Sequence, residues 1–259
     1  MKCNPPSPIA LALVFTIAAA CPANLRALAS TGTATNAGAM SDDTDEQSQA
    51  LIATADFNRD GIADVARVIQ PDRDGSGARV LEILIGQKNG GFGRGVNRTL
   101  TVSNPRSIAT GDFNGDGNPD LLIGDRDGRV IELLGDGKGN LKPAGEIAHV
   151  GSAVSIAVGD FNRDGIPDVA VSDFQGNSVI ILLGSAGGSF RTGWSFALPQ
   201  RGTVYYLAAA DFNGDGVSDL AITGGEEATF VVMLGNGNGT FTYAPSLSNI
   251  RDPYSYCPT

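Results

Sequence analysis

The sequence predicts an all-β fold assembled from four copies of one structural unit. Nearly the same nine residues occur four times, at residues 56–64, 112–120, 160–168 and 211–219. The copies start roughly 50 residues apart, a spacing that indicates solenoids and propellers. The 259 residues include 35 glycines and 13 prolines, which favours many turns and few long helices.

We interpret residues 1–20 as a secretory signal peptide rather than a buried core helix. The apolar run at residues 9–20 (IALALVFTIAAA) is too short to span a bilayer. Small residues offer cleavage sites before Cys21 and before Ser30. The stretch ending at Cys21 also resembles a bacterial lipoprotein signal, but Ala18 stands where such signals usually carry Leu. We therefore expect a secreted, periplasmic or cell-surface protein, and a lipid anchor on Cys21 is the less favoured alternative.

Residues 21–49 are small, polar and acidic without a period, which is typical of a flexible linker. Of the three cysteines, Cys3 leaves with the signal, and Cys21 and Cys257 define no disulfide framework. We expect a repeat domain at residues 50–250 and a C-terminal tail at 251–259. The expected repeat units are residues 50–104, 105–151, 152–201 and 202–250.

Each repeat divides into four strands separated by turns. In the third repeat the expected strands are residues 155–159, 169–172, 178–183 and 190–198, and the nine-residue segment joins the first two. Four antiparallel strands per repeat make one blade of a β-propeller. The sequence therefore predicts a four-bladed propeller, closed as one small ring or forming half of a ring that a second copy completes.

The first strand of each repeat carries only Ala or Gly on one face. These residues stand three and one positions before the nine-residue segment: Ala53, Ala55, Ala109, Gly111, Ala157, Gly159, Ala208 and Ala210. Side chains two apart share a face of a strand. Such small residues favour the crowded innermost strand of a blade, close to the central axis.

The first repeat departs from the others. Three residues after its loop stands Arg67, where the other repeats have an apolar residue. Terminal repeats are often atypical because one face lacks a neighbour, so we expect a more exposed blade, with a ligand contact as the alternative. Its insertion at residues 70–78, like the DRDG at 125–128, reads as a turn rather than an extra metal site.

The nine-residue segments have the composition of loops that wrap a hard cation. Oxygen-bearing side chains occupy positions 1, 3, 5 and 9, and glycine occupies position 6. Calcium takes six to eight oxygen ligands from carboxylates, amides and backbone carbonyls. We expect ligands from the side chains at positions 1, 3, 5 and 9 and from the carbonyl at position 7. They are Asp56, Asn58, Asp60, Ile62 and Asp64; Asp112, Asn114, Asp116, Asn118 and Asp120; Asp160, Asn162, Asp164, Ile166 and Asp168; and Asp211, Asn213, Asp215, Val217 and Asp219.

Other assignments of these loops fit less well. Zinc, copper and haem iron need His or Cys, and the chain has one His; magnesium prefers strict octahedral geometry. An EF-hand needs Glu at position 12, where this chain has Arg67, Ile123, Val171 and Ile222. A simple hairpin turn does not need three carboxylates, which would repel without a cation. We therefore predict up to four calcium ions.

The segment GDFNGDGNPDLLIG and its three relatives, each followed by a strand and a glycine-rich turn, resemble FG-GAP repeats. Such repeats build integrin α-chain propellers and many secreted bacterial proteins. The resemblance spans residues 50–249 and implies calcium bound by all four loops on one rim of a propeller. Integrin propellers have seven blades and a membrane helix far downstream. Four repeats without such a helix indicate that this chain is not an integrin subunit.

The net charge of −10 and the lack of a basic stripe exclude nucleic acid as a partner. Catalysis is not expected, since the aspartates of the loops are committed and no nucleophile stands beside a base. We predict a calcium-binding adhesion or recognition module for an extracellular protein or glycan. The alternative is a calcium-dependent glycan lyase or hydrolase, or its accessory domain. Trp194, Tyr205 and Tyr206 suit sugar stacking, but packing within the blades is favoured.

Overall fold

The computed structural model describes residues 51–69, 78–100, 102, 104–197, 204–224 and 229–244. The signal peptide, the linker and the C-terminal tail that the sequence predicts lie outside these residues. Residues 70–77 of the first-repeat insertion and the side chain of Tyr205 lie outside them as well.

The described residues form four separate sheets, each with four antiparallel strands in chain order, which confirms the all-β prediction. The first blade contains β1 (Leu51–Ala55), β2 (Asp64–Ile69), β3 (Val80–Gly86) and β4 (Phe92–Thr99). The second contains β5 (Pro105–Gly111), β6 (Asp120–Asp125), β7 (Arg129–Gly135) and β8 (Leu141–His149). The third contains β9 (Ala153–Gly159), β10 (Asp168–Asp173), β11 (Ser178–Ser185) and β12 (Ser189–Ala197). The fourth contains β13 (Val204–Ala210), β14 (Asp219–Gly224), β15 (Thr229–Gly235) and β16 (Phe241–Tyr243).

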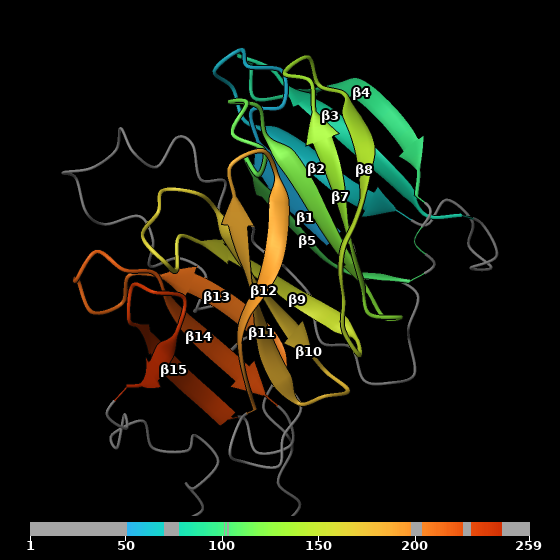
Figure 1. The fold of residues 1–259 in the computed structure, drawn as a ribbon. Helices are drawn as coiled ribbons and strands as arrows, with labels where there is room; N and C mark the ends of the chain where they lie inside the picture. The colour runs from blue at the N-terminus through green and yellow to red at the C-terminus, as the bar shows by residue number, and fades with distance from the viewer. Residues whose placement is uncertain are drawn as a thin grey trace, which may run out of the picture.

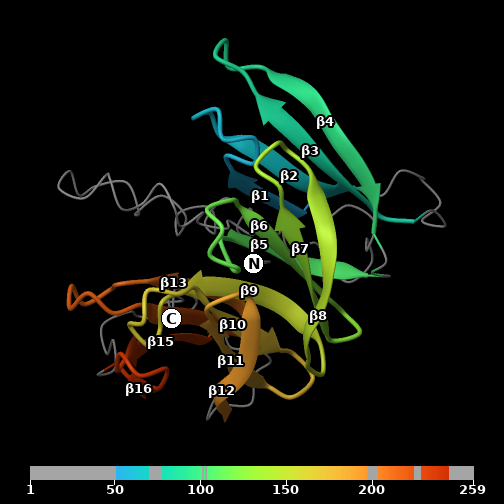
Figure 2. The same cartoon turned by 45° about the horizontal axis from the view of Figure 1, so that its top comes forward.

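The blades follow one another in a curved array whose sheets do not close into a ring (Figure 1). Figure 2 shows the first blade at the top and the fourth at the bottom. The first strands of neighbouring blades lie side by side, β1 against β5, β5 against β9, and β9 against β13. Every regular element among the described residues is a strand, so none of them forms a helix that could span a membrane.

Small side chains allow the first strands to approach one another. Ala53 and Ala109 are completely buried, and Ala157 nearly so. Gly111 has a specific reason for lacking a side chain, because a Cβ there would lie 2.7 Å from the ring of Phe113. The ring of this loop residue therefore folds back beneath the strand that precedes it. This packing agrees with the inner-strand prediction made from the Ala and Gly pattern.

Three apolar cores hold the four blades together, one between each neighbouring pair. Blades two to four each turn six apolar side chains toward the blade before them, and we call this surface the preceding face. In the second blade the preceding face consists of Ile108, Leu121, Ile123, Ile131, Leu133 and Leu141. The opposite surface of each blade, which packs against the next preceding face, is the following face. Each contact between blades is thus asymmetric and repeats along the chain.

A phenylalanine at loop position 2 projects from the following face into the next blade. Phe161 is fully buried, and its ring lies 5.3 Å from that of Phe241 in an edge-to-face arrangement. Phe113 contacts Phe190 in a tilted arrangement, with the ring centroids 5.8 Å apart. In the last blade the equivalent Phe212 is 50% exposed, because no fifth blade covers it.

The preceding face of the first blade is also uncovered among the described residues. Arg67 lies on this face and forms a salt bridge with Glu82 on the neighbouring strand, with Nε donating to Oε2 at 2.6 Å. The Arg67 side chain is 42% exposed. The expectation of a more exposed terminal blade is therefore confirmed.

Replacing the loop phenylalanine should test whether these cores hold the array together. Phe161→Ala removes a buried ring and should lower the free energy of unfolding by about 3 to 5 kcal/mol. Phe212→Ala, at the same loop position in the last blade, should change it by less than about 1 kcal/mol in dilute solution. Urea denaturation measures both. Equal losses in the two variants would contradict the assignment of Phe161 to an interblade core.

Candidate metal centre

The four loops connect the first and second strands of their blades. The residue before position 1 pairs across the hairpin with position 9, as Gly111 pairs with Asp120 and Gly159 with Asp168. Position 9 therefore starts the second strand, while positions 1 to 8 form the connection. The same topology in every blade brings all four loops to the same rim of the array.

The aspartate at position 9 joins three parts of its blade. In the second blade, Asp120 Oδ2 accepts a hydrogen bond from the N–H of Phe113 at 2.9 Å. Its Oδ1 accepts one from the N–H of Gly135, at the end of the third strand, at 2.8 Å. All four blades make this pair of bonds, at 2.7 to 2.9 Å. Each of these aspartates is fully buried.

The glycine that ends each third strand completes this arrangement. A Cβ on Gly135 would collide with the carbonyl oxygen of Pro119, the residue just before Asp120. The equivalent glycines of the other blades are in the same position relative to their loops: Gly86, Gly184 and Gly235. Sequence reasoning missed that each of these glycines donates its N–H to the aspartate at position 9. The available signal is that an apolar residue followed by glycine stands at or next to the end of every third strand.

The rim of each loop is closed by its own polar side chains. In the second loop, the N–H of Asp116 donates both to Asp112 Oδ1 at 3.1 Å and to Asn114 Oδ1 at 2.8 Å. Asp112 Oδ2 accepts from the N–H of Gly117, and Asp116 Oδ1 from the N–H of Asn118. The other three loops repeat these four bonds. The side-chain oxygens of positions 1 and 3 thus both accept from the backbone N–H of position 5.

Position 4 adopts a left-handed backbone in every loop, although two loops have arginine there. Gly115 and Gly214 have φ of 75° and 80°, whereas Arg59 and Arg163 have φ of 60° and 63°. A non-glycine residue in this region is strained. Arg163 Nη2 donates to the carbonyl oxygen of Asp215 in the next loop at 2.7 Å. The strained residue therefore links the third loop to the fourth.

The acids at the rim and at position 9 have opposite electrostatic environments. Burial raises the pKa of Asp120 and of Asp168 to about 6, although N–H groups of the third strand and of the loop favour their charged forms. The N–H of Gly216 and other loop N–H groups lower the pKa of Asp211. Partial burial opposes ionisation of Asp116, but hydrogen bonds from Asn118 and Asn114 outweigh it and lower its pKa. Hydrogen bonds therefore favour the charged forms of these two rim acids, Asp116 and Asp211.

The donor atoms of each loop fit a hard cation by their chemistry, since all of them are oxygens. Among the described residues, however, no three His, Cys, Asp or Glu side chains are gathered into a metal-binding group. In each loop position 3 is an asparagine, and the position 9 carboxylate is buried, with one oxygen accepting from the loop and the other from the third strand. Only the acids at positions 1 and 5 remain at each rim. Every carboxylate oxygen has two lone pairs, so a hydrogen bond does not by itself prevent coordination.

The other candidate functional residues, His149 and Trp194, and the DRDG segment lie outside the four loops. His149 is exposed on β8 and pairs with Glu146 at 3.1 Å. Trp194 stacks on Phe196 and on Phe241, with centroids at 4.8 and 6.0 Å, so it packs between the third and fourth blades. The DRDG segment at residues 125–128 is a turn, as predicted.

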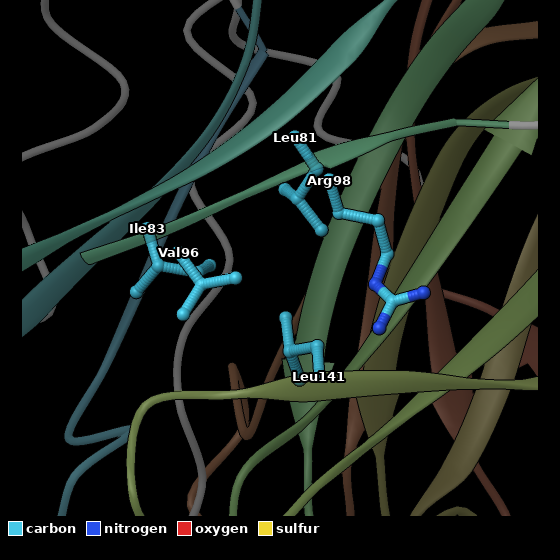
Figure 3. Close-up of a pocket in the computed structure, with 5 residues that line it drawn as sticks. All are labelled: Leu81, Ile83, Val96, Arg98 and Leu141. Carbon is cyan, nitrogen blue, oxygen red and sulfur yellow. The ribbon is translucent and has the colours of Figure 1, made fainter.

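A small hollow lies between the first two blades (Figure 3). Its lining carries no acid, hydroxyl or thiol and consists of Leu81, Ile83, Val96, Arg98 and Leu141. The hollow arises because these side chains are smaller or more polar than their counterparts between the last two blades, where Trp194 and Phe241 stack. We find no catalytic chemistry in it.

Glu132 is a buried acid that sequence reasoning missed. It is 5% exposed on β7, and its Oε1 accepts no hydrogen bond from the described residues. Alternation along the strand places it on the following face, where the first and third blades have Ile83 and Ile181. Burial, and then the nearby charge of Asp120, raises the pKa of Glu132 to about 7.

A comparison with protein-family models agrees with this architecture. A family model described as "FG-GAP-like repeat" matches residues 56–123, 112–171 and 160–222. A search of curated proteins found no match. Among solved structures, the chain is similar to one described as "Crystal structure of BBS1N in complex with ARL6DN, soaked with mercury". That similarity has a TM-score of 0.49 at 15% identity, and it covers 76% of this chain and 53% of that chain.

Substitutions of Arg163 should separate its backbone strain from its contact with the fourth loop. Arg163→Gly and Arg163→Ala both remove the bond to Asp215, but only glycine relieves the left-handed strain. The glycine variant should therefore be more stable than the alanine variant by about 1 kcal/mol in urea denaturation. At Arg191, an exposed position on β12, the order should reverse, because glycine weakens a strand. An alanine variant at position 163 as stable as the glycine variant would contradict this interpretation.

Glu132 should make stability depend on pH. The folded chain holds the Glu132 proton more tightly than the unfolded chain, so the free energy of unfolding should fall as pH rises from 4.5 toward about 7. Glu132→Ile should be more stable than the wild type at pH 8 by about 1 to 3 kcal/mol, and this advantage should shrink at pH 5. Denaturation in chelator at both pH values measures this. An unchanged pH profile in Glu132→Ile and in the isosteric Glu132→Gln would refute the assignment.

Proposed function

The chain belongs to the FG-GAP-like repeat family, and from that premise we propose that it is a calcium-stabilised, non-catalytic recognition or adhesion module. The observation that carries the proposal is the exact repetition of one hydrogen-bonded loop in all four blades. An active site is normally a single constellation of unlike residues. Four identical oxygen-rich loops instead favour a structural role that every blade needs.

Calcium is supported by the donor atoms and by charge. The rim of the second loop offers Asp112, Asn114, Asp116 and the carbonyl of Asn118, and the buried Asp120 is hydrogen-bonded to the N–H of Phe113 in the same loop. A bound divalent cation would supply positive charge among acids that otherwise repel. Affinity of the order of 10⁻⁴ to 10⁻³ M, typical of extracellular modules, is sufficient outside the cell. The apolar N-terminal run, interpreted as a secretion signal, agrees with that location.

A recognition role is supported by the way the array is built. The loop aspartates accept hydrogen bonds from backbone N–H groups. The apolar cores between the blades fix the positions of neighbouring blades, and therefore of their loops. Rigid strands that carry polar connections at one edge are a common basis for binding surfaces. The partner class that we propose is an extracellular protein or glycan.

Calcium should raise the melting temperature of the chain, because it binds the folded loops and not the unfolded chain. At a calcium concentration about 100-fold above the Kd, binding to one site should add about 2.7 kcal/mol. Thermal melts in calcium, in magnesium and in chelator measure this, and calorimetry gives the number of ions. Asp164→Ala should remove one of up to four binding events, whereas Glu146→Gln, outside the loops, should remove none. A melting temperature unaffected by calcium would overturn the metal proposal.

The non-catalytic assignment has its own test. The purified chain is screened against a glycan array and against polysaccharide and ester substrates, with calcium and with chelator. We expect calcium-dependent retention on one ligand class and no turnover. Turnover that survives alanine substitution of the rim aspartates would instead favour the enzymatic alternative.

A further inference from the structure

The two ends of the array expose the two surfaces that the blades bury against each other. No described residue covers the preceding face of the first blade or the following face of the last blade. In the first blade the six positions of the preceding face are Ile52, Val65, Arg67, Glu82, Leu84 and Phe92. Four of these six residues are apolar, whereas all six are apolar in the preceding faces that are buried between blades.

The uncovered following face of the last blade is strongly apolar. Phe212 and Phe230 are 50% and 42% exposed, and Ala208 and Ala221 lie on the same face. The equivalents of Phe230 in the second and third blades, Val130 and Val179, are completely buried. Large aromatic side chains exposed together on one surface indicate an interaction site.

The two uncovered faces are complementary in the same way as the internal ones. Between the later blades, a loop phenylalanine contacts a phenylalanine at the start of the next blade's fourth strand, as Phe113 contacts Phe190 and Phe161 contacts Phe241. Phe212 is the loop phenylalanine without such a partner. Phe92 is the fourth-strand residue without a loop phenylalanine against it, and it is 54% exposed.

Charge does not oppose the contact. The Arg67–Glu82 pair at the centre of the first blade's face is internally satisfied, with 2.6 Å between Nε and Oε2. The described side chains of the last blade's following face carry no charge, so no like charge meets this pair. A paired charge next to an apolar surface is far less costly than an unpaired one.

We propose that a second copy of this chain docks head to tail, with its first blade against the last blade of the first copy. Phe212 of one copy packs against Phe92 of the other and reproduces the Phe113–Phe190 contact for a further interface. A head-to-tail contact closes into a ring when the rotation permits and otherwise extends into a chain of copies. The curved, open array supplies the same two surfaces in either case.

The test is the oligomeric state of the full chain by analytical ultracentrifugation over a range of concentrations. Wild type should sediment as a dimer or larger species, and Phe212→Asp and Phe92→Asp should each shift it to monomer. Each variant keeps one intact face, so an equimolar mixture of the two should restore a dimer. Tyr243→Asp, an exposed aromatic on the outermost strand β16, should leave the assembly unchanged.

Two outcomes would overturn the proposal. A wild-type chain that stays monomeric at every concentration would show that nothing, or another part of the same chain, covers these faces. An assembly abolished by Phe212→Asp but unaffected by Phe92→Asp would show that the last blades pair with each other. Circular dichroism of each variant keeps loss of folding distinct from loss of assembly, since both residues are exposed and outside the cores.

Discussion

The structure depends on one buried carboxylate per blade. The aspartate at loop position 9 accepts a hydrogen bond from the start of its own loop and another from the end of the third strand. These two bonds fix the loop onto the sheet, and the neighbouring glycine can have no side chain because the loop carbonyl lies against it. A buried carboxylate is costly unless it is hydrogen-bonded, and here both oxygens accept backbone N–H groups. The loop and the end of the third strand are therefore held to the second strand by the same side chain.

Fixing the loop also fixes how blades meet. The residue after loop position 1 is a phenylalanine whose N–H bonds to the buried aspartate, so its ring is directed into the following blade. Because every blade is built in the same way, every contact between blades has the same direction. An array with this property must end in two unlike faces, one projecting a phenylalanine and the other receiving one. The Arg67–Glu82 pair makes the receiving end more polar than its internal counterparts.

The acids of each loop have two different environments: those at positions 1 and 5 lie at the rim, and the one at position 9 is buried in the blade. Hydrogen bonds lower the pKa of Asp116 and Asp211 at the rim, while burial raises the pKa of the position 9 acid in the second and third blades. The sequence grouped all these acids as equivalent candidate ligands. Hydrogen bonds between the loop and the third strand distinguish them, and those bonds join Asp120 to Gly135, which are far apart in the sequence pattern. The spacing of residues within the nine-residue loop cannot show that Gly135, which lies outside the loop, donates a hydrogen bond to Asp120.

The sequence by itself determined the all-β class, the four-stranded unit and the small inner strands, because strand periodicity, turn residues and a repeat are local signals. Arg67 at a position that is otherwise apolar also identified the exposed terminal blade. Only the tertiary structure decided which side of each blade meets its neighbour, that Trp194 packs in a core, and that Glu132 is buried without a partner for Oε1. These facts depend on contacts between separate sheets. A strand's pattern shows that it has two faces, but the neighbour that covers each face is set by how the blades stack.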